Sequence, residues 1–265
     1  MVRCVVCGLG FVNPRPTADA IKVFYPPAFY AGREISRQGG RYDAQAAFLA
    51  DLRPGRLLDV GCAGGAFLRV MQNRGWMVEG VDRFAMGGNE HGLDIHYGEL
   101  PALKLPSSNF DVVTAWGVLE HLHDPLEYLR EIARVLRPGG RFVALVTNLR
   151  SVWSRYAYGE DIPRHLYFFS AGTLRRYAVE TGLRLRATDY SSSVLRADGR
   201  DVFRVLMLRA LGFDWHQIYR EGGTRGALRF AERGANVLGR MITTRRVESA
   251  FGIAGVMVST MERPA

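Results

Sequence analysis

The sequence predicts an α/β protein in which seven strands form a mostly parallel, Rossmann-like sheet with helices on both faces. Three observations support this prediction. Short apolar runs alternate with stretches of helical periodicity along most of the chain. The runs are continuously apolar, as expected for strands that are buried on both faces. One of them, in residues 57–68 ("LLDVGCAGGAFL"), passes into a helical pattern through small residues, a common way to hold a nucleotide-like ligand.

The predicted elements follow one another in a regular order. Strands are expected at residues 56–61, 77–82, 94–97, 110–116 and 141–147, with helices at 65–74, 84–91 and 125–137. The Arg-Pro-Gly-Gly sequence at 137–140 indicates a helix stop and a turn. A helix at 172–181, which starts near the cap Ser170, precedes a strand at 183–190, and a final strand is expected at 252–260. Upstream, Thr17 caps a short helix that Pro26-Pro27 ends, and an amphipathic helix covers 41–53.

The net charge of +9 is concentrated in one segment. Of the 35 basic residues, only Lys22 and Lys104 are lysines, and residues 200–246 hold ten arginines against four acidic residues. A GC-rich bacterial genome explains this preference for arginine over lysine better than a nucleic-acid-binding surface does. We therefore expect no nucleic-acid partner. No apolar window is long enough to span a membrane, and no signal peptide is recognisable. Three cysteines suit a reducing compartment, and we expect a cytoplasmic protein.

The glycine-rich turn after the first predicted strand of the sheet can be compared with a dinucleotide-binding fingerprint. That fingerprint needs the spacing G-x-G-x-x-G, but the glycines here are Gly61, Gly64 and Gly65, and Ala63 replaces the middle one. Asp82 ends the next predicted strand, 21 positions after Gly61. Its carboxylate can accept hydrogen bonds from both hydroxyls of a ribose. That chemistry suits any adenosine-bearing ligand.

The succession "LLDVGCAGGAFL", "VEGVD", "FDVVTAWGVLEHLHDP" and "LRPGG" resembles the class I S-adenosylmethionine-dependent methyltransferases over about residues 41–190. The resemblance implies S-adenosylmethionine as the cofactor and a last strand that runs antiparallel to the rest, with a helical insert before it. It implies that the turn cradles the methionine part, that Asp59 supports the amino end, that Asp82 binds the ribose, and that the residues around Glu99 contact the adenine. The full set of cofactor-binding residues predicted in this way is Asp59, Gly61, Cys62, Ala63, Gly64, Gly65, Asp82, Arg83, Glu99, Leu100 and Trp116.

The segment "TNLRSVWSRYAYGEDIPRHLYFFSAGTLRRYAVETGL" is similar to a bacterial subgroup of small-molecule enzymes akin to the ubiquinone-biosynthesis O-methyltransferases. This resemblance implies a small-molecule acceptor, with O-methylation favoured. Two other functions stay open: a module that binds the cofactor without catalysis, and a methyltransferase for a lipid- or carrier-linked acceptor. A nucleobase N-methyltransferase is excluded, because "AWGV" does not match the Asn/Asp-Pro-Pro-aromatic motif of that class.

Two loops at the carboxyl end of the predicted sheet supply the candidate catalytic residues, because the methyl donor lies at that end. His121 and His165 are the candidate bases, since a histidine titrates near neutrality. The alternative is structural: His121 packs against the following helix and His165 holds its loop. The predicted substrate contacts are Tyr30, Trp116, Glu120 and Arg164. In the ubiquinone-type relatives, acidic residues before "LEH" help bind a divalent metal. Gly117 occupies one of these positions here, so no metal is predicted.

The opening "CVVCGLGFVNPRP" also matches that subgroup, many members of which start with two Cys-x-x-Cys pairs. Cys4 and Cys7 match only the second pair, and two thiols are half of a structural zinc site. Either the other ligands lie upstream or the zinc knuckle has been lost. The chain is therefore predicted to consist of an N-terminal segment with half a zinc knuckle and a lid helix (1–38), a cofactor-binding core (39–198), a basic helical insert (199–248) and a final core strand (249–265).

The basic insert has two interpretations. Leu228, Ala231, Ala235, Leu238 and Ile242 recur at helical spacing, opposite several arginines. The insert could therefore be a helical cover over the sheet edge or a dimer face. The oligomeric state is accordingly expected to be a monomer or a homodimer. It could instead be a lid that selects an anionic or lipid-like acceptor, or a membrane-surface patch.

Overall fold

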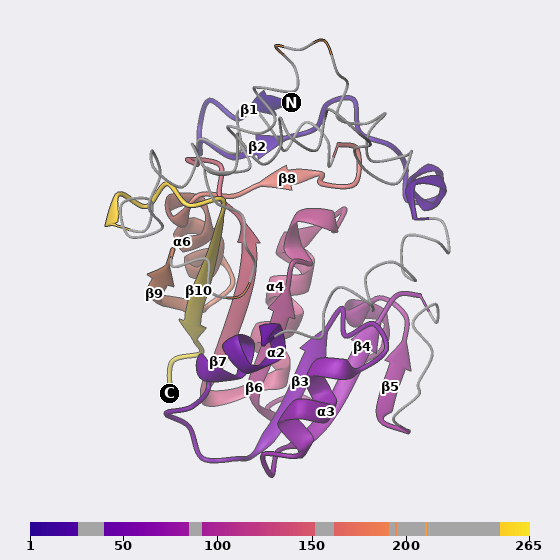
Figure 1. Ribbon diagram of the computed structural model, residues 1–265, viewed down its shortest axis with the longest axis vertical. Coiled ribbons are helices and arrows are strands. Elements are labelled where there is room, and N and C mark those ends of the chain that lie inside the picture. The colour runs from indigo at the N-terminus through magenta and orange to yellow at the C-terminus, as the bar shows by residue number, and fades with distance from the viewer. Residues whose placement is uncertain are drawn as a thin grey trace.

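The computed structural model describes residues 1–25, 40–84, 92–151, 162–190 and 250–265, together with residues 194, 210 and 212. Its main sheet has seven strands in the order β5-β4-β3-β6-β7-β10-β9 (Figure 1). Their bounds are β3 Arg56–Val60, β4 Met77–Asp82, β5 Asp94–Tyr97, β6 Phe110–Trp116, β7 Leu136–Thr147, β9 Arg184–Asp189 and β10 Val256–Glu262.

The strand directions confirm the predicted fold class. β5, β4, β3, β6 and β7 pair in parallel, whereas β10 is antiparallel to both of its neighbours, β7 and β9. Parallel pairing places the carboxyl ends of these five strands at one edge of the sheet. The seven-stranded, mostly parallel sheet with an antiparallel last strand is therefore the architecture that the sequence predicts.

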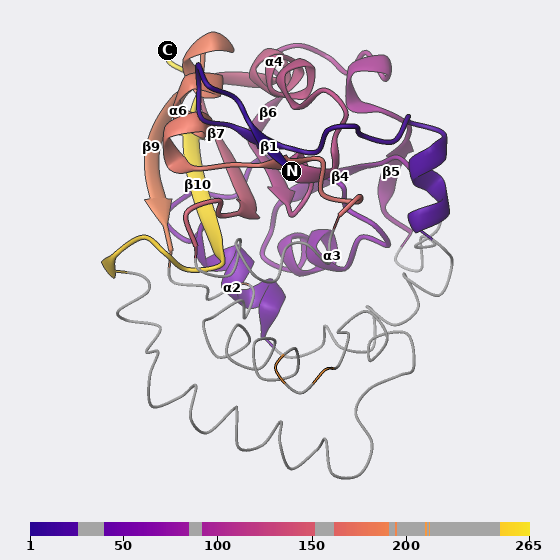
Figure 2. The same ribbon diagram turned by 90° about the horizontal axis from the view of Figure 1, so that it is seen from above.

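Helices cover both faces of the sheet, as expected for strands that are buried on both sides. α2 Arg41–Ala47 and α3 Ala66–Gln72 lie on one face, and α4 Pro125–Val135 and α6 Ala171–Glu180 on the other (Figure 2). Local signals start the last two helices. Asp124 accepts hydrogen bonds from two backbone N–H groups of α4, and Ser170 forms the capping box of α6.

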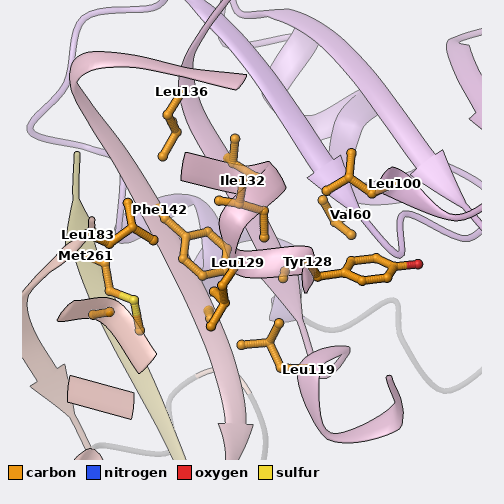
Figure 3. Close-up of a cluster of buried hydrophobic side chains, with 14 of the residues drawn as sticks. Val60, Leu100, Leu119, Tyr128, Leu129, Ile132, Leu136, Phe142, Leu183 and Met261 are labelled. Carbon is orange, nitrogen blue, oxygen red and sulfur yellow. The ribbon is translucent and has the colours of Figure 1, made fainter. Parts of the chain in front are cut away.

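The larger hydrophobic core lies between the sheet and α4 with α6. Figure 3 shows Leu129 and Ile132 of α4 beside Phe142 of β7 and Met261 of β10, and all four are fully buried. The second core joins the opposite face of the sheet to α2 and α3 through residues such as Phe67. The sheet is thus held from both sides, which fixes the positions of the loops at its carboxyl edge.

Three element boundaries differ from the prediction by more than two residues. β7 begins at Leu136, directly after α4, because Gly139 and Gly140 exchange backbone hydrogen bonds with Arg263. β10 begins at residue 256, because the Asn148 side chain binds the carbonyls of residues 252 and 254 and fastens them in a loop. α2 is six residues shorter than its predicted range of 41–53, since the chain continues as turns with i to i−3 hydrogen bonds.

A small second sheet is absent from the prediction. β1 Val2–Arg3, β2 Gly10–Phe11 and β8 Tyr167–Phe168 pair antiparallel in the order β1-β2-β8. Figure 1 shows this sheet above the carboxyl ends of the parallel strands. It ties the N-terminal segment to the chain that follows His165. A 3₁₀ helix, Ala20–Phe24, follows, and the Thr17 hydroxyl accepts a hydrogen bond from the N–H of its first residue. The residue at the cap position is Asp19 and not the predicted Thr17, because the helix begins three residues after Thr17.

Several predictions fall on residues outside the described ranges. These are the helix at 84–91 beyond residue 84, the basic insert at 199–248 apart from two isolated positions, and the substrate contact Tyr30. Within the described part of the chain, no helix is both long and apolar enough to cross a membrane.

Candidate active site

The turn between β3 and α3 needs glycine at two positions. Gly61 has a φ of +74°, and a Cβ atom there would lie 2.5 Å from Val118 Cγ2. Gly65 has a φ of +82°, and its Cβ would lie 2.6 Å from Leu93 Cδ1. Ala63 also adopts a positive φ, of +50°. The turn therefore packs closely against the loop that follows β6, which leaves no room for a side chain at Gly61. The turn lies at the carboxyl edge of the sheet.

Asp82 fastens this turn to the end of β4. Its Oδ2 accepts a hydrogen bond from the Ala63 N–H, and its Oδ1 accepts one from the Phe84 N–H, both at 2.9 Å. Burial raises the pKa of Asp82, and these two hydrogen bonds oppose the rise. Because each carboxylate oxygen can accept more than one hydrogen bond, Asp82 keeps acceptor capacity for a ligand.

Asp59 lies next to this turn, at the end of β3. Only 3% of the residue is exposed, and its Oδ1 accepts a hydrogen bond from Thr114 Oγ1 at 2.6 Å. Burial raises its pKa to about 7 and the nearby Asp82 adds to the rise, while Thr114 and the Arg41 guanidinium oppose it. Arg41, the first residue of α2, therefore brings a positive charge to the surroundings of Asp59. The sequence analysis missed Arg41 as a site residue. The signal for it is weak, a cation at the start of an amphipathic helix.

The predicted adenine side of the site is a small polar cluster. Arg83 Nε lies 2.9 Å from Glu99 Oε1, and the Tyr128 hydroxyl donates a short hydrogen bond to Glu99. The Arg83 guanidinium also stacks on the Phe84 ring, 5.3 Å from its centroid. Leu100, next to Glu99, is fully buried. Asp82, Arg83 and Glu99 therefore lie at the carboxyl ends of the adjacent strands β4 and β5, and their contacts to a cofactor stay a prediction.

The structure brings the two candidate bases together from separate loops. The rings of His121 and His165 meet edge to face with centroids 4.6 Å apart. His121 Nδ1 lies 3.0 Å from the Arg164 carbonyl oxygen and 2.9 Å from the Tyr25 hydroxyl. Glu120 is 98% buried beside them. The predicted group of Glu120, His121, Arg164 and His165 is thus a single cluster.

Tyr25 is a member of this cluster that the sequence analysis missed. The tyrosine selected there was Tyr30, five residues further along. The Tyr25 ring lies 6.2 Å from the rings of both His121 and Phe84, so it connects the histidines to the residues that follow Asp82. Its position directly before Pro26-Pro27 was the only signal for it.

Trp116 lies on a different side from the histidines. The residue is 9% exposed, and its ring packs 5.5 Å from Phe67 and 6.2 Å from Phe48, on the face covered by α2 and α3. Leu119, which precedes the histidine cluster, packs instead in the core under α4. The loop after β6 therefore sends side chains to both faces of the sheet.

Two groups of side chains within the described residues could hold a metal ion. The possible ligand atoms of Glu120, His121 and His165 all lie within 4.8 Å of one another, as do those of Glu79, Asp94 and His96. In the second group, Glu79 already pairs with Arg56 at 2.6 Å. The absence of a metal requirement stays a prediction.

The three cysteines differ in surroundings. Cys4 and Cys7 are half-buried free thiols, and backbone N–H groups of Cys7 and Val6 lower the pKa of Cys4. Cys62 lies in the glycine turn, where burial raises its pKa. A structural zinc would need two more ligands beside Cys4 and Cys7.

A cavity lies at the opposite edge of the sheet. It has a volume of about 190 Å³, and its lining includes Trp76, Asp111, Arg137 and Gly140. Asp111 belongs to the amino-terminal end of β6, where its Oδ2 accepts the backbone N–H of Arg56. This cavity is therefore separate from the turn, the two aspartates and the histidine cluster.

The chain is similar in sequence to known proteins. The profile of a methyltransferase domain family matches residues 35–188. A ubiquinone biosynthesis O-methyltransferase of Caulobacter vibrioides is 38% identical over 147 residues, which are 51% of this chain and 58% of that protein. The chain thus spans less than two thirds of the relative's length.

Solved structures show the same fold at lower identity. An S-adenosylmethionine-dependent methyltransferase from Archaeoglobus fulgidus has a TM-score of 0.57 at 18% identity, covering 88% of this chain and 99% of the other. The [4+2]-cyclase SpnF has a TM-score of 0.61 at 20% identity, covering 97% and 99%. The shared fold thus occurs in proteins whose titles name different reactions.

Proposed function

Because the chain belongs to the class I S-adenosylmethionine-dependent methyltransferases, we propose that it transfers a methyl group from S-adenosylmethionine to a hydroxyl oxygen of a small molecule. The observation on which this proposal rests is that Asp59 precedes the glycine turn and Asp82 binds its backbone, while the charge of Arg41 acts on Asp59. The O-methyltransferase name of the Caulobacter relative supports oxygen as the methylated atom.

The residues at the turn fit the parts of this cofactor one by one. Asp59 and Arg41 offer one negative and one positive charge, which suit the ammonium and carboxylate groups of its methionine part. Gly61 keeps the turn open, since a Cβ there would meet Val118. Asp82 has acceptor capacity for ribose hydroxyls, and Arg83 with Glu99 offers polar contacts to the adenine. When bound, the cofactor supplies a methyl group on a positively charged sulfonium.

In this proposal, one residue of the histidine pair removes the proton of the acceptor. In the tautomer in which His121 Nδ1–H donates to the Arg164 carbonyl, Nε2 is the basic nitrogen. Glu120 is buried next to the pair, with a carboxylate oxygen within 4.8 Å of a ring nitrogen of each histidine. The oxygen then attacks the methyl carbon in line with the departing sulfur, so these residues orient the acceptor and accept one proton.

The other parts of the proposal concern the surroundings of the protein. We place it in the cytoplasm as a monomer or homodimer that acts on a free small molecule, without a nucleic-acid partner. The three cysteines support a reducing compartment, because Cys4, Cys7 and Cys62 are all free thiols. The arginines of residues 200–246 favour a form of this proposal in which the acceptor is anionic or lipid-like.

The alternative function is a module that binds the cofactor without methyl transfer. Cofactor binding and methyl transfer need separate tests, because the same fold occurs in SpnF, whose title names a cyclase. Calorimetry with S-adenosylmethionine and with NADH tests the first, and we expect saturable binding of S-adenosylmethionine alone. Transfer of a labelled methyl group to members of a panel of phenols and hydroxy acids tests the second. Binding of NADH without S-adenosylmethionine contradicts the proposal, and cofactor binding with an unreactive panel favours the non-catalytic function.

A further inference from the structure

The chain that follows β2 is fastened to both loops that carry the candidate bases. We call this segment, residues 12–25, the N-terminal strap. The Val12 N–H donates to the carbonyl of Leu166, which directly follows one candidate base, at 2.9 Å. His123 Nε2, two residues after the other candidate base, donates to the Pro16 carbonyl at 3.0 Å. Figures 1 and 2 together show the strap passing above the carboxyl ends of the parallel strands.

Arg15 strengthens this attachment. Its Nη1 atom donates to the backbone carbonyl of His123 at 3.2 Å and also to the Tyr167 hydroxyl. That hydroxyl donates to the same carbonyl at 3.1 Å, and the guanidinium lies over the Tyr167 ring, 5.6 Å from its centroid. The N–H of Leu166 donates to the Glu120 carbonyl at 2.7 Å. Hydrogen bonds therefore join the strap, the loop after β6 and the start of β8 within two residues of each candidate base.

The strap ends at a tyrosine that contacts His121. Ile21, in the 3₁₀ helix Ala20–Phe24, is 2% exposed and anchors this end of the strap in the protein. Tyr25 follows directly, and its N–H donates to the Lys22 carbonyl at 3.0 Å. The Tyr25 and His121 rings meet edge to face with centroids 6.2 Å apart. The strap therefore adds a side chain to the histidine cluster.

Two oxygen atoms lie at hydrogen-bond distance from the same nitrogen of His121. The Arg164 carbonyl oxygen is 3.0 Å from Nδ1, and the Tyr25 hydroxyl oxygen is 2.9 Å from it. Because a carbonyl only accepts, its hydrogen bond requires a proton on Nδ1. The hydroxyl oxygen then accepts from the same N–H. Both contacts are therefore satisfied together when Nδ1 carries the proton and Nε2 of the neutral ring carries none.

The other neutral tautomer of His121 satisfies only one of these contacts. With the proton on Nε2, Nδ1 accepts from the Tyr25 hydroxyl, and the lone pairs of Nδ1 and of the Arg164 carbonyl oxygen face each other. Two acceptors without a proton between them repel, so this tautomer is disfavoured. When the ring takes up a proton at Nε2, the Nδ1–H group remains, and both oxygens stabilise the positive charge.

We propose that Tyr25 is a positioning residue, whose hydroxyl accepts the Nδ1–H of His121 and holds the ring in the tautomer that presents Nε2 as the base. This inference rests on the proposed function, because it gives Tyr25 a role in proton removal by His121. In that step the acceptor O–H bond breaks and Nε2 gains the proton. The electron pair stays on the oxygen and forms the bond to the methyl carbon, while the electrons of the broken carbon–sulfur bond stay on sulfur.

Tyr25→Phe removes the hydroxyl and keeps the ring contacts with His121 and Phe84. The first readout is the ¹⁵N NMR spectrum of histidine-labelled, ligand-free protein at about pH 8, where most imidazole rings are neutral. The His121 signals are assigned by their loss in His121→Ala. We expect a protonated Nδ1 and an unprotonated Nε2 in the wild type, and a mixture of both tautomers in Tyr25→Phe. A wild-type ring that carries its proton on Nε2 overturns the inference.

The second readout is transfer of a labelled methyl group to the most reactive member of the phenol and hydroxy-acid panel. We expect kcat to fall about tenfold in Tyr25→Phe, which corresponds to about 1.4 kcal/mol. The acceptor KM and the Kd of S-adenosylmethionine should be nearly unchanged, because the ring contacts remain. Tyr190→Phe is the matched control, since it removes a hydroxyl beyond the end of β9, at the far edge of the sheet, and it should keep the wild-type kcat.

The pH profile distinguishes positioning of the base from a purely structural role. The titratable groups that lie against His121 are the Tyr25 hydroxyl, the Glu120 carboxylate and the His165 ring, and Tyr25→Phe changes only the first. The charged ring loses one acceptor in this variant. The acidic limb of the kcat profile should therefore move to lower pH by about half a unit.

The outcomes separate this inference from the proposed function. Wild-type protein that transfers no methyl group to any panel member contradicts the proposed function. Wild-type protein that transfers the methyl group, while Tyr25→Phe keeps its tautomer, kcat and pH profile, overturns only the inference. A kcat that falls without a change in tautomer or pH profile also overturns it, because Tyr25 then has a purely structural role.

Discussion

The raised pKa of Asp59 predicts that cofactor affinity depends on pH. Its carboxyl group is buried and has a pKa of about 7, raised mainly by burial and also by the nearby Asp82. If Asp59 binds the ammonium group of S-adenosylmethionine, it does so in the ionised form. Below pH 7 the ligand-free protein holds a proton there, and this proton must leave before the cofactor binds.

The size of the effect follows from the ionised fraction. At pH 6, roughly a tenth of the side chains with a pKa of about 7 are ionised, so the Kd is about tenfold weaker than at pH 8. Each further unit of acidity weakens binding by about another factor of ten. Asp59→Asn is the matched variant, because the amide oxygen can still accept the Thr114 hydrogen bond but the group does not titrate. Its Kd should be weaker than that of the wild type at pH 8 and constant with pH.

Calorimetry at pH 6, 7 and 8, in two buffers with different ionisation enthalpies, measures both the Kd and the protons released. We expect nearly one proton released per cofactor at pH 6 and almost none at pH 8. A wild-type Kd that is constant over this range refutes the reasoning. So does a pH dependence that survives in Asp59→Asn, because another group would then titrate.

The same pKa shift affects the ligand-free protein in the opposite direction. A carboxyl group whose pKa rises on folding stabilises the folded state below its unfolded pKa, and this contribution is lost as the pH rises through the folded pKa. For Asp59, the shift from 3.8 to about 7 corresponds to on the order of 4 kcal/mol. Between pH 4 and pH 7, the Tm of the wild type should fall relative to that of Asp59→Asn.

Three further predictions concern other parts of the site. Asp82→Asn should weaken S-adenosylmethionine binding about a hundredfold by calorimetry, because an amide NH₂ cannot accept one of the two backbone N–H bonds and the charge is lost; an unchanged Kd in a folded variant removes Asp82 from the site. Replacing His121 or His165 by Ala should lower turnover about a hundredfold for whichever is the base, with little change in cofactor Kd and loss of the acidic limb of the rate profile. If both variants keep full turnover, neither is the base. Gly61→Ala should lower the Tm more than Gly182→Ala, because both glycines have a φ of +74° but only the first has a side chain within 4 Å of the added Cβ; equal losses would show that backbone strain alone matters.

The main sheet could be predicted because its signals are local. Each parallel strand is a continuous apolar run, and the turn at Gly61 and Gly65 marks the change from strand to helix. The small sheet of β1, β2 and β8 could not be predicted in this way. Its strands have two residues each, too few for a periodicity, and the pairing of β2 with β8 joins residues more than 150 positions apart.

The residues of the candidate site likewise include some that local sequence signals predict and some that they do not. Asp59 and Asp82 were predictable, because each ends or nearly ends an apolar strand at the carboxyl edge of a parallel sheet. Gln45 and Thr147 were not, because nothing in the sequence distinguishes them from polar residues on the surface. They differ from surface residues in being buried with a polar atom that has no hydrogen-bond partner among the described residues, which only the folded chain shows.

The order of the strands predicts that cofactor binding, proton removal and acceptor binding depend on different strands, so that single variants can separate their effects. Asp82 and Asp59 end or nearly end β4 and β3, where the cofactor is proposed to bind, and Thr147 ends β7, two strands away from β3. The histidine loop leaves β6, the strand between them, so the proposed base lies at the boundary between donor and acceptor. Effects of variants should therefore follow strand position: Kd for the cofactor on β4 and β3, kcat at the loop after β6, and KM for the acceptor on β7. A Thr147 variant that changes only cofactor affinity contradicts this division, since nothing in the strand order would then separate the two substrates.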